Sequence, residues 1–412
     1  MDNATESASE DRRILPALYL LLLVFVGTSL EYGISGPMLP LYIIGLGASV
    51  SVMSACFAAM DMVSTVVRIP VGVLSDRYGS RIFLVGGVIL SILALLISTI
   101  SQTWQQLLVA MIFSGLAGGL FYTVQQKAIA LTADVKGRSR AFALSSLMWS
   151  LIGFSTPVAA GYLVEHHGLR SPFIVGLFAS LLGLPLSLRI KIGDSDKANP
   201  HIAMQGRYTK LGDDLPVMAN LGLAQLILTI ARAVPWTLTA IYLKMRFGCT
   251  YSEVGYYLAM MSLGGIVATP VAARLGTPRA RRGSILILMP VMGFIFIGLA
   301  LSRSALSMTV LMFFMNMLGL ICGTSIDALA ADAAPKGRLG MAYGVSSTTI
   351  RLGYAVGSFL GGYFADFFGF EIAFFMGAGF SFLSIVPAFT LGRFLPSPRS
   401  TGSCQHEVHF DP

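Results

Sequence analysis

Residues 72–81 read GVLSDRYGSR, and they connect two long apolar runs at about residues 49–75 and 80–100. The stretch places an aspartate and two arginines between glycines, so it is charged and able to turn sharply. Each flanking run is long enough to cross a membrane, because a transmembrane helix needs about 20 mostly apolar residues. The pattern predicts two membrane-spanning helices that are joined by a tight, charged loop.

The composition extends this interpretation to the whole chain. Hydrophobic residues make up 55% of the 412 residues and charged residues only 12%, whereas about 25% is usual in a soluble domain. The net charge is +8, but the basic residues fall in short loops between apolar runs, which argues against nucleic-acid binding. We predict a multi-pass protein of the lipid bilayer and exclude a disordered chain, a secreted disulfide scaffold and a nucleic-acid-binding module.

Motifs for catalysis and metal binding are missing from the sequence. The four cysteines, Cys56, Cys249, Cys322 and Cys404, do not share metal-ligand spacing. Neither a glycine-rich phosphate loop nor a serine nucleophile elbow occurs. We therefore expect no metal, no cofactor and no enzymatic activity.

About twelve apolar runs occur along the chain, and the longest polar interruption follows the sixth. We predict a tail at 1–13, a six-helix bundle at 14–190, a linker at 191–214, a second six-helix bundle at 215–393 and a tail at 394–412. The predicted spans cover about 14–40, 49–75, 80–100, 104–131, 140–164, 171–190, 215–243, 252–275, 283–302, 304–330, 338–366 and 371–393.

The loop charges predict the orientation, since Lys and Arg gather on the cytoplasmic side of a membrane protein. With the N-terminus in the cytoplasm, the outer loops hold only Arg170, Lys244, Arg246 and Arg303 of the 28 basic residues. An even number of spans returns the chain to the same side. We expect a protein of the cell (inner) membrane with both termini cytoplasmic.

The two halves of the chain align at an offset of about 200 residues. Tyr42 falls on Tyr242 and Pro70 on Pro270. With one residue of drift, Gly168 and Phe173 match Gly369 and Phe374, and Gly161 falls on Gly361. Two six-span halves in parallel orientation indicate a transporter that rocks around a site between them.

The loop at 72–81 resembles the signature G-x-x-x-D-R-x-G-R-[RK] of the major facilitator superfamily. Gly72, Asp76, Arg77, Gly79 and Arg81 match it, and Ser80 departs from the usual arginine. The resemblance covers about residues 14–393 and implies an all-α membrane fold of about twelve transmembrane helices in two six-helix bundles. It also implies that the loop cluster latches the halves together on the cytoplasmic side.

The charges of this loop suggest specific partners. Asp76 can face a neighbouring helix N-terminus, where negative charge is favoured, and Arg77 or Arg81 can pair with Asp134. The alternative is a turn that only sets the topology. Arg68, just before Pro70, is expected to support this loop cluster.

A stretch of the fifth span resembles the pattern G-x-x-x-G-P-x-x-G-G of the superfamily's proton-coupled twelve-span exporters. Gly153, Pro157 and Gly161 are the residues concerned, with Thr156 and Ala160 as small substitutes. The alternative is the packing of small residues that is common between membrane helices. The fourth-span signature of these exporters begins with an arginine, and here Met111 occupies that position.

Ionisable residues inside spans are costly and suggest function. Spans one, four, seven and ten each carry one, and the resemblance implies that these spans line a central cavity. We predict an outer gate formed by Glu31 and Arg232 and an inner gate formed by Lys127 and Asp327. Packing or interfacial roles are the alternatives.

Asp61 and Arg351 lie near the middle of spans two and eleven. A fixed pair between the halves and a substrate site are equally compatible with that position. Glu31 is the preferred proton carrier, and Asp61 is the alternative.

Uncharged polar and aromatic residues on the same spans are candidates for the substrate cavity. Amides and ring faces suit amphiphilic ligands. The methionines of span ten, Met308, Met312, Met315 and Met317, are expected either to form a plastic cavity wall or to face lipid. The cavity candidates are Tyr32, Tyr122, Gln125, Gln126, Gln225, Trp236 and Asn316.

These observations favour a secondary active transporter of a small molecule that works by alternating access, with protons as the coupling ion, as a monomer. Export of amphiphilic or drug-like compounds by antiport is preferred, on the fifth-span pattern and Glu31. Proton-coupled uptake of an anionic metabolite is the alternative, because Arg232 and Arg351 suit an anion. A transport-inactive receptor on the same scaffold is the alternative of a different class.

Overall fold

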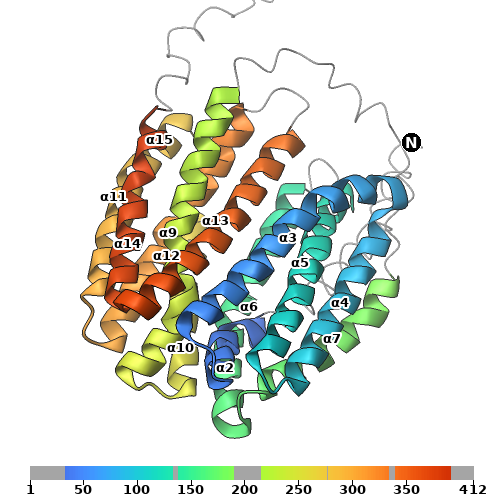
Figure 1. Ribbon diagram of the computed structural model, residues 1–412. Helices are drawn as coiled ribbons and strands as arrows, with labels where there is room; N and C mark the ends of the chain where they lie inside the picture. Colours follow the sequence, from blue (N-terminus) through green and yellow to red (C-terminus); the bar gives the residue numbers. More distant parts are fainter. Residues whose placement is uncertain (1–32, 133–137, 190–214, 276, 334–338, 391–412) are drawn as a thin grey trace, which may run out of the picture.

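The computed structural model describes residues 33–132, 138–189, 215–275, 277–333 and 339–390. Every regular element in these ranges is a helix. The elements are η1 (Gly36–Met38), α2 (Leu39–Gly45), α3 (Val50–Tyr78), α4 (Ser80–Ile100), α5 (Trp104–Thr132), α6 (Arg138–His167), α7 (Ser171–Arg189), α9 (Leu215–Phe247), α10 (Tyr251–Ala273), α11 (Pro278–Ala300), α12 (Ala305–Ala333), α13 (Leu339–Phe368), α14 (Phe370–Leu383) and α15 (Ile385–Thr390) (Figure 1).

The helices have the length and composition of membrane spans. Within the described ranges, 9 helices are long and apolar enough to cross a membrane. Each predicted span from the second to the twelfth coincides with a helix, and the twelfth coincides with the pair α14 and α15. The predicted all-α membrane fold is thus confirmed. The first span is described only from residue 33, and the predicted tails and linker lie outside the described residues.

Local sequence explains where several helices begin and end. Ser49 caps α3, since its side chain accepts a hydrogen bond from the backbone N–H of Val52 at 3.3 Å. A capping box of Thr250 and Glu253 begins α10. The last span breaks at Ser384, three residues before Pro387, because a proline ring clashes with the preceding helical turn.

The charged loop between the second and third spans is shorter than predicted. Helix α3 continues to Tyr78, and α4 begins at Ser80, so the turn consists of Gly79 alone. Gly79 has φ +85°, a conformation that glycine adopts without steric cost, and its N–H donates to the carbonyl of Ser75. The residues from Gly72 to Tyr78 therefore form the last two turns of a membrane helix.

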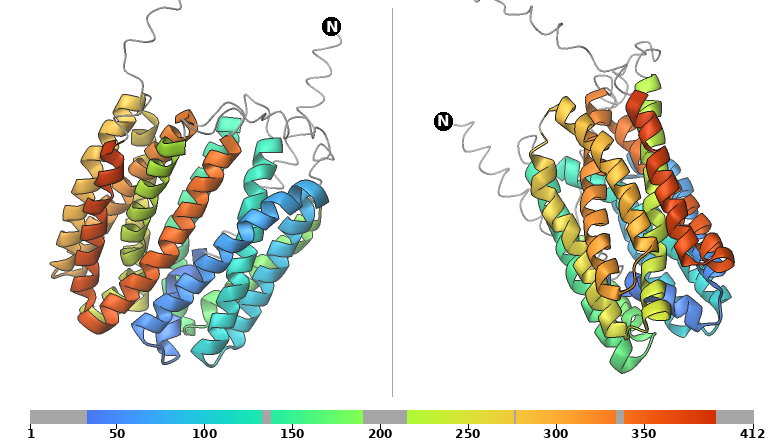
Figure 2. Two further views of the ribbon diagram at one scale, coloured as in Figure 1. Left: turned by 45° about the horizontal axis from the view of Figure 1, so that its top comes forward. Right: turned by 90° about the vertical axis from the view of Figure 1, so that its left-hand side faces the viewer.

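The helices form two bundles, one of η1 to α7 and one of α9 to α15. The two largest contacts between them are those of α3 with α13 and of α6 with α10. The 200-residue offset maps the second span on the eighth and the fifth on the eleventh, so the two interfaces are copies of each other. We call the end that carries Arg189 and Leu215 the linker end and the opposite end the far end. Helices α3 and α13 approach near the far end and diverge toward the linker end (Figures 1 and 2).

The internal repeat is visible in the packing. In the first bundle the ring of Tyr42 lies 5.0 Å from that of Phe173, and in the second Tyr242 lies 5.4 Å from Phe374. Gly168 and Gly369, which precede the sixth and last spans, both have positive φ, at 84° and 94°. The residues that align in the sequence therefore occupy equivalent places in the two halves.

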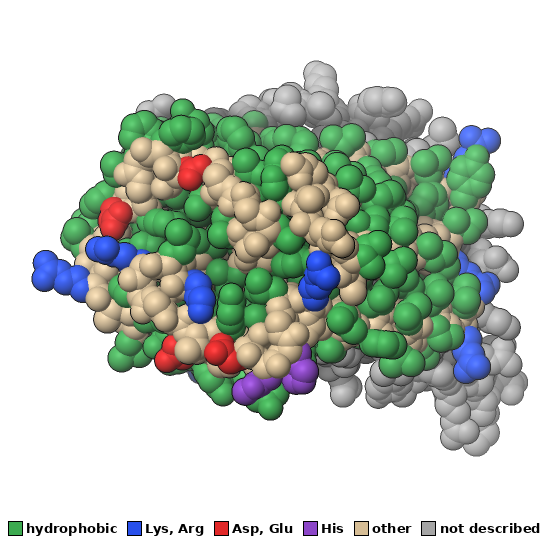
Figure 3. All heavy atoms as spheres, turned by 60° about the horizontal axis from the view of Figure 1, so that its bottom comes forward, with side chains coloured by type: hydrophobic (Ala, Val, Ile, Leu, Met, Phe, Trp, Pro, Cys, Tyr) green, Lys and Arg blue, Asp and Glu red, His purple; other side chains and the backbone are tan. Residues whose placement is uncertain are grey.

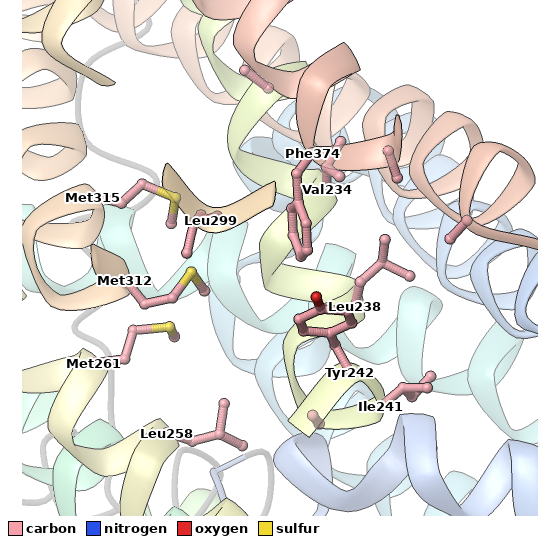
Figure 4. Close-up of a cluster of buried hydrophobic side chains, with 14 of the residues drawn as sticks. Val234, Leu238, Ile241, Tyr242, Leu258, Met261, Leu299, Met312, Met315 and Phe374 are labelled. Carbon is pink, nitrogen blue, oxygen red and sulfur yellow. The ribbon is translucent and has the colours of Figure 1, made fainter. Parts of the chain in front are cut away.

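Three of the four α12 methionines differ from both expectations. Met308, Met312 and Met315 are 0%, 1% and 3% exposed and belong to the core of the second bundle. Figure 4 shows Met312 and Met315 facing this core, with Met261 and Leu299 close by. These three residues neither line the central cavity nor face lipid. The sequence did not indicate this, because all surfaces of a membrane helix are apolar and the core side looks like the lipid side.

Candidate functional site

A cavity of about 370 Å³ lies between the two bundles. It is lined by α3, α4, α5 and α6 from one bundle and by α9, α10, α12 and α13 from the other. Its volume falls within the range of small-molecule sites. The wall is rich in aromatic rings, which come from Phe57, Phe121, Tyr122, Trp236 and Tyr354.

An ion pair at the cavity joins the bundles. The Nη1 atom of Arg351 on α13 lies 3.2 Å from Oδ1 of Asp61 on α3 and donates a hydrogen bond to it. The side chain of Asp61 is 10% exposed, and that of Arg351 is 31% exposed. Arg351 therefore lines the cavity while it holds Asp61. The structure brings these two predicted residues together, and their role in transport stays a prediction.

Arg68 interacts with this pair, and its expected role beside the loop cluster stays a prediction. It lies seven residues beyond Asp61, which is nearly two turns along the same face of α3 toward the linker end. It interacts electrostatically with Asp61, Arg351 and Tyr122. Its Nε atom is buried and has no hydrogen-bond partner among the described residues. The seven-residue spacing from Asp61 is the sequence signal that could have identified it.

Arg232 lines the opposite wall of the cavity, on α9. Its Nη1 atom donates a long hydrogen bond of 3.4 Å to the backbone carbonyl of Gly319 on α12, and its Nε atom is buried without a described partner. Arg232 lies this close because Gly319 has no side chain, as a Cβ there would lie 2.5 Å from Nε. Glu31, the predicted partner of Arg232, lies outside the described residues.

Replacing Gly319 with alanine is expected to displace the guanidinium of Arg232 from α12. The displaced group is the flexible end of a side chain, so we expect thermal unfolding to change little and substrate affinity to fall several-fold. Gly283 on α11 is the control, because nothing lies within 4 Å of a Cβ there. Equal affinity in the Gly319→Ala and Gly283→Ala proteins would mean that the position of Arg232 does not matter for binding.

The uncharged candidates divide into three groups. Tyr122, Trp236 and Asn316 line the cavity, and the amide of Asn316 also donates to the carbonyl of Met261 at 3.1 Å. Gln225 does not line it: the side chain is buried, and its Oε1 has no described partner. Three candidates cannot be placed: Tyr32 lies outside the described residues, and the side chains of Gln125 and Gln126 are not described.

The structure describes the side chain of only one of the two residues predicted to form the inner gate. Asp327 accepts a hydrogen bond of 2.5 Å from the hydroxyl of Ser346 on α13. The side chain of Lys127 is not described. The partner of Asp327 that the structure shows thus belongs to the same bundle.

The loop signature is placed at the linker end of the first bundle. Arg81 donates to the backbone carbonyl of Leu188 at the end of α7, and the guanidinium of Arg77 lies 5.6 Å from the centre of the Tyr78 ring. Gly72 is helical, the side chain of Asp76 is not described, and Asp134 lies outside the described residues. Arg81 is therefore bound within its own bundle in this conformation, and the latching role stays a prediction.

The small residues of the fifth span form a contact between the bundles. Gly161 on α6 faces α10 so closely that a Cβ there would lie 2.5 Å from the carbonyl oxygen of Tyr251. A Cβ on Gly255 of α10 would overlap the carbonyl oxygen of Pro157. Gly153, about two turns before Gly161 on α6, lines the cavity. Close packing is what the structure assigns to this pattern, and a role in antiport stays a prediction.

The far end of the cavity is closed by contacts between the bundles. At this end Glu165 of α6 accepts a hydrogen bond from a backbone N–H of α10, and Asp366 of α13 accepts one from a backbone N–H of α3. Figure 3 shows the far end as a continuous surface in which acidic, basic and apolar side chains are mixed. The conformation is therefore one in which the bundles meet at the far end and separate toward the linker end.

Comparisons with known proteins agree with this architecture. The family model of the Major Facilitator Superfamily matches residues 21–323 and again residues 221–407, so the second match begins 200 residues after the first. An uncharacterized MFS-type transporter of Methanocaldococcus jannaschii is 25% identical over 351 residues, which are 83% of this chain and 89% of that protein. Multidrug resistance protein MdtG of Klebsiella pneumoniae is 21% identical over 397 residues, 93% of this chain and 94% of that one.

A likeness to solved structures extends over the same length. The crystal structure of a POT family transporter in complex with 5-aminolevulinic acid aligns with a TM-score of 0.76 at 16% identity. The alignment covers 92% of this chain and 96% of that chain, and it shows a shared fold. Since the family model matches from residue 21 to residue 407, the chain belongs to the Major Facilitator Superfamily and is a multi-pass membrane transporter.

Proposed function

We propose that the protein is a secondary active transporter that exports small amphiphilic or drug-like compounds in exchange for protons. The observation that carries the proposal is the cavity between the bundles, whose aromatic wall surrounds an acid–base pair that joins the two halves. Aromatic surfaces accept apolar bodies of varied shape, and a few polar groups orient them. The similarity to a protein named for multidrug resistance supports export.

The position of the ion pair supports alternating access as the mode of transport. While Asp61 is charged, its attraction to Arg351 holds α3 against α13. A proton on Asp61 removes that attraction, so the bundles can rock more freely around the cavity. The described charged groups that act on Asp61 are Arg351 and Arg68. Glu31 remains the other candidate for the proton carrier.

The direction of export depends on the orientation in the membrane. With the predicted orientation, in the cell (inner) membrane with both termini cytoplasmic, the linker end faces the cytoplasm. A cavity that is closed at the far end would then receive its substrate from the cytoplasm. The expected division into bundles at 14–190 and 215–393, and a monomer as the working unit, complete the proposal.

Uptake of an anionic metabolite together with protons is the second candidate. It is favoured by the excess of positive charge, because Arg232 and Arg351 line the cavity, Arg68 interacts with Asp61, and Asp61 is the only described carboxylate in the cavity wall. An anion that replaces Asp61 at Arg351 would leave this carboxylate to be neutralised by a proton. Anion and proton would then move in the same direction.

Proton flux in liposomes separates these candidates. The protein is reconstituted with a pH-sensitive dye inside, and amphiphilic cations, neutral compounds and organic anions are added in turn. For export by antiport we expect proton movement opposite to the substrate. Asp61→Asn is expected to reduce it to the level of empty liposomes, and Glu31→Gln tests the other carrier.

Glu371→Gln at the far end is the control and is expected to keep wild-type flux. Flux in the same direction as an anion would overturn antiport and support uptake. Substrate binding without any flux would support the third possibility, a transport-inactive receptor on the same scaffold.

A further inference from the structure

Two carboxylates at the far end bind helix N-termini of the opposite bundle. Oε2 of Glu165, at the end of α6, accepts hydrogen bonds from the backbone N–H groups of Tyr251 at 2.7 Å and Ser252 at 3.4 Å. Oδ2 of Asp366, at the end of α13, accepts bonds from the N–H of Ser51 at 3.3 Å and from its hydroxyl at 2.5 Å. Each bundle thus supplies one carboxylate and one helix N-terminus.

The internal repeat relates the two contacts. Glu165 lies one turn after Gly161, and Asp366 lies one turn after Gly362. At Gly161, α6 touches the backbone of Tyr251. At Gly362, α13 touches α3, because a Cβ on Gly362 would lie 3.0 Å from the carbonyl oxygen of Val50. In both interfaces a glycine brings the helices together and an acidic residue one turn later binds the first residues of the partner helix.

The physical basis of the contact is the helix N-terminus. Its first N–H groups lack partners within the helix, and the aligned peptide dipoles leave partial positive charge there, so a carboxylate is favoured. Both carboxylate residues are exposed. Water and salt therefore screen each contact, and each one remains weak enough to break and form again.

We propose that Glu165 and Asp366 are twin latches that hold the far end closed and that both must release before the cavity opens there. The proposal rests on alternating access as the mode of transport. It does not depend on the substrate or on protons. The latches position the bundles and do not contact the cavity, since neither residue lines it.

Distance measurements between spin labels on the two bundles test the latches. Thr103 and Arg303 are exposed in equivalent far-end loops, one in each bundle, and serve as labelling sites after the four natural cysteines are replaced. Glu165→Ala and Asp366→Ala are each expected to raise the population with a separated far end by roughly fivefold. The double variant is expected to multiply the two effects, because the latches are in separate interfaces.

Two further variants distinguish a latch from a general effect of charge. Glu371→Ala removes a carboxylate at the same end, on α14, and is expected to leave the distances unchanged. Asp366→Glu keeps the charge and is expected to resemble wild type. Unchanged distances in the double variant, or an equal shift in Glu371→Ala, would overturn the proposal. Because no substrate is added, this result is independent of whether the protein exports or takes up its substrate.

Discussion

Transport is expected to fall by about 100-fold or more when Arg351 is replaced with alanine. The change leaves the Asp61 carboxylate in the wall of the cavity without the guanidinium that lies 3.2 Å away. Removing one partner of a buried ion pair typically costs about 3–5 kcal/mol, which corresponds to a shift of roughly 100-fold or more in an equilibrium constant. The initial rate of uptake into proteoliposomes measures the loss. Arg303→Ala, which removes an exposed arginine, should keep the rate within about twofold.

Double variants show whether the pair is structural or functional. Asp61→Asn with Arg351→Gln removes both charges, so no unpaired charge remains, and we expect folding and thermal stability to recover. Coupling to protons should not recover, because the carboxylate is gone. Full recovery of proton-coupled transport would contradict a functional role and leave the pair as a structural contact.

Exchanging the charges of Asp61 and Arg351 is expected to restore transport only in part, because Arg68 lies close to position 61. Asp61→Arg with Arg351→Asp rebuilds an ion pair, but it places the new arginine on the same face of α3 as Arg68, which interacts electrostatically with position 61. We expect partial rescue from the swap alone. Adding Arg68→Gln should increase the rescue, and no increase would show that Arg68 acts independently of the pair.

The fold could be predicted from the sequence because its determinants are local. The sequence itself shows apolar runs of about 20 residues, basic loops and the 200-residue repeat. The turn at Gly79 is an example: a glycine between two apolar runs marks the helix boundary within a few residues. Equivalent contacts within the two bundles follow from the repeat, since Tyr42 with Phe173 and Tyr242 with Phe374 form the same packing twice.

The site was predicted less completely because it depends on helix rotation. In a membrane protein, lipid and core are both apolar, so composition does not tell which side of a helix faces inward. This is why Met312 was expected at the cavity or in lipid and lies in the core. The interaction of Arg68 with Asp61 joins residues two turns apart on α3, and the neighbours of Arg68 in the sequence do not indicate it. Asp327 has a hydroxyl partner, Ser346, that spacing alone does not identify.

The far-end carboxylates are also marked by a signal in the sequence. Glu165 and Asp366 are both acidic and lie 201 residues apart, close to the offset of the repeat. Comparing only identical residues between the halves hides such pairs. A comparison of charge at equivalent positions would have found them, although not the backbone N–H groups that they bind.

Replacing Gly255 with leucine is expected to separate α6 from α10 and to stop transport. A Cβ at Gly255 would overlap the carbonyl oxygen of Pro157 and lie 3.2 Å from the Cα of Gly161. These are backbone atoms, so no side-chain rotation relieves the overlap, and the bundles themselves must move apart. Overpacking of this kind costs about 1–3 kcal/mol even in cores that can adjust, or roughly 5- to 100-fold in the population of the closed far end.

The same distance measurement and the same transport assay test this prediction. Gly283→Leu is the matched control, because a Cβ at Gly283 meets nothing within 4 Å, and it should leave both results near wild type. Gly362→Ala should act in the same direction as Gly255→Leu, since it disturbs the equivalent interface between α13 and α3. Transport needs each conformation in turn. A protein that cannot close its far end therefore cannot complete the transport cycle, however well it binds substrate. Wild-type transport by Gly255→Leu would therefore mean that α6 and α10 do not have to meet, and that the closed far end is not a step of the cycle.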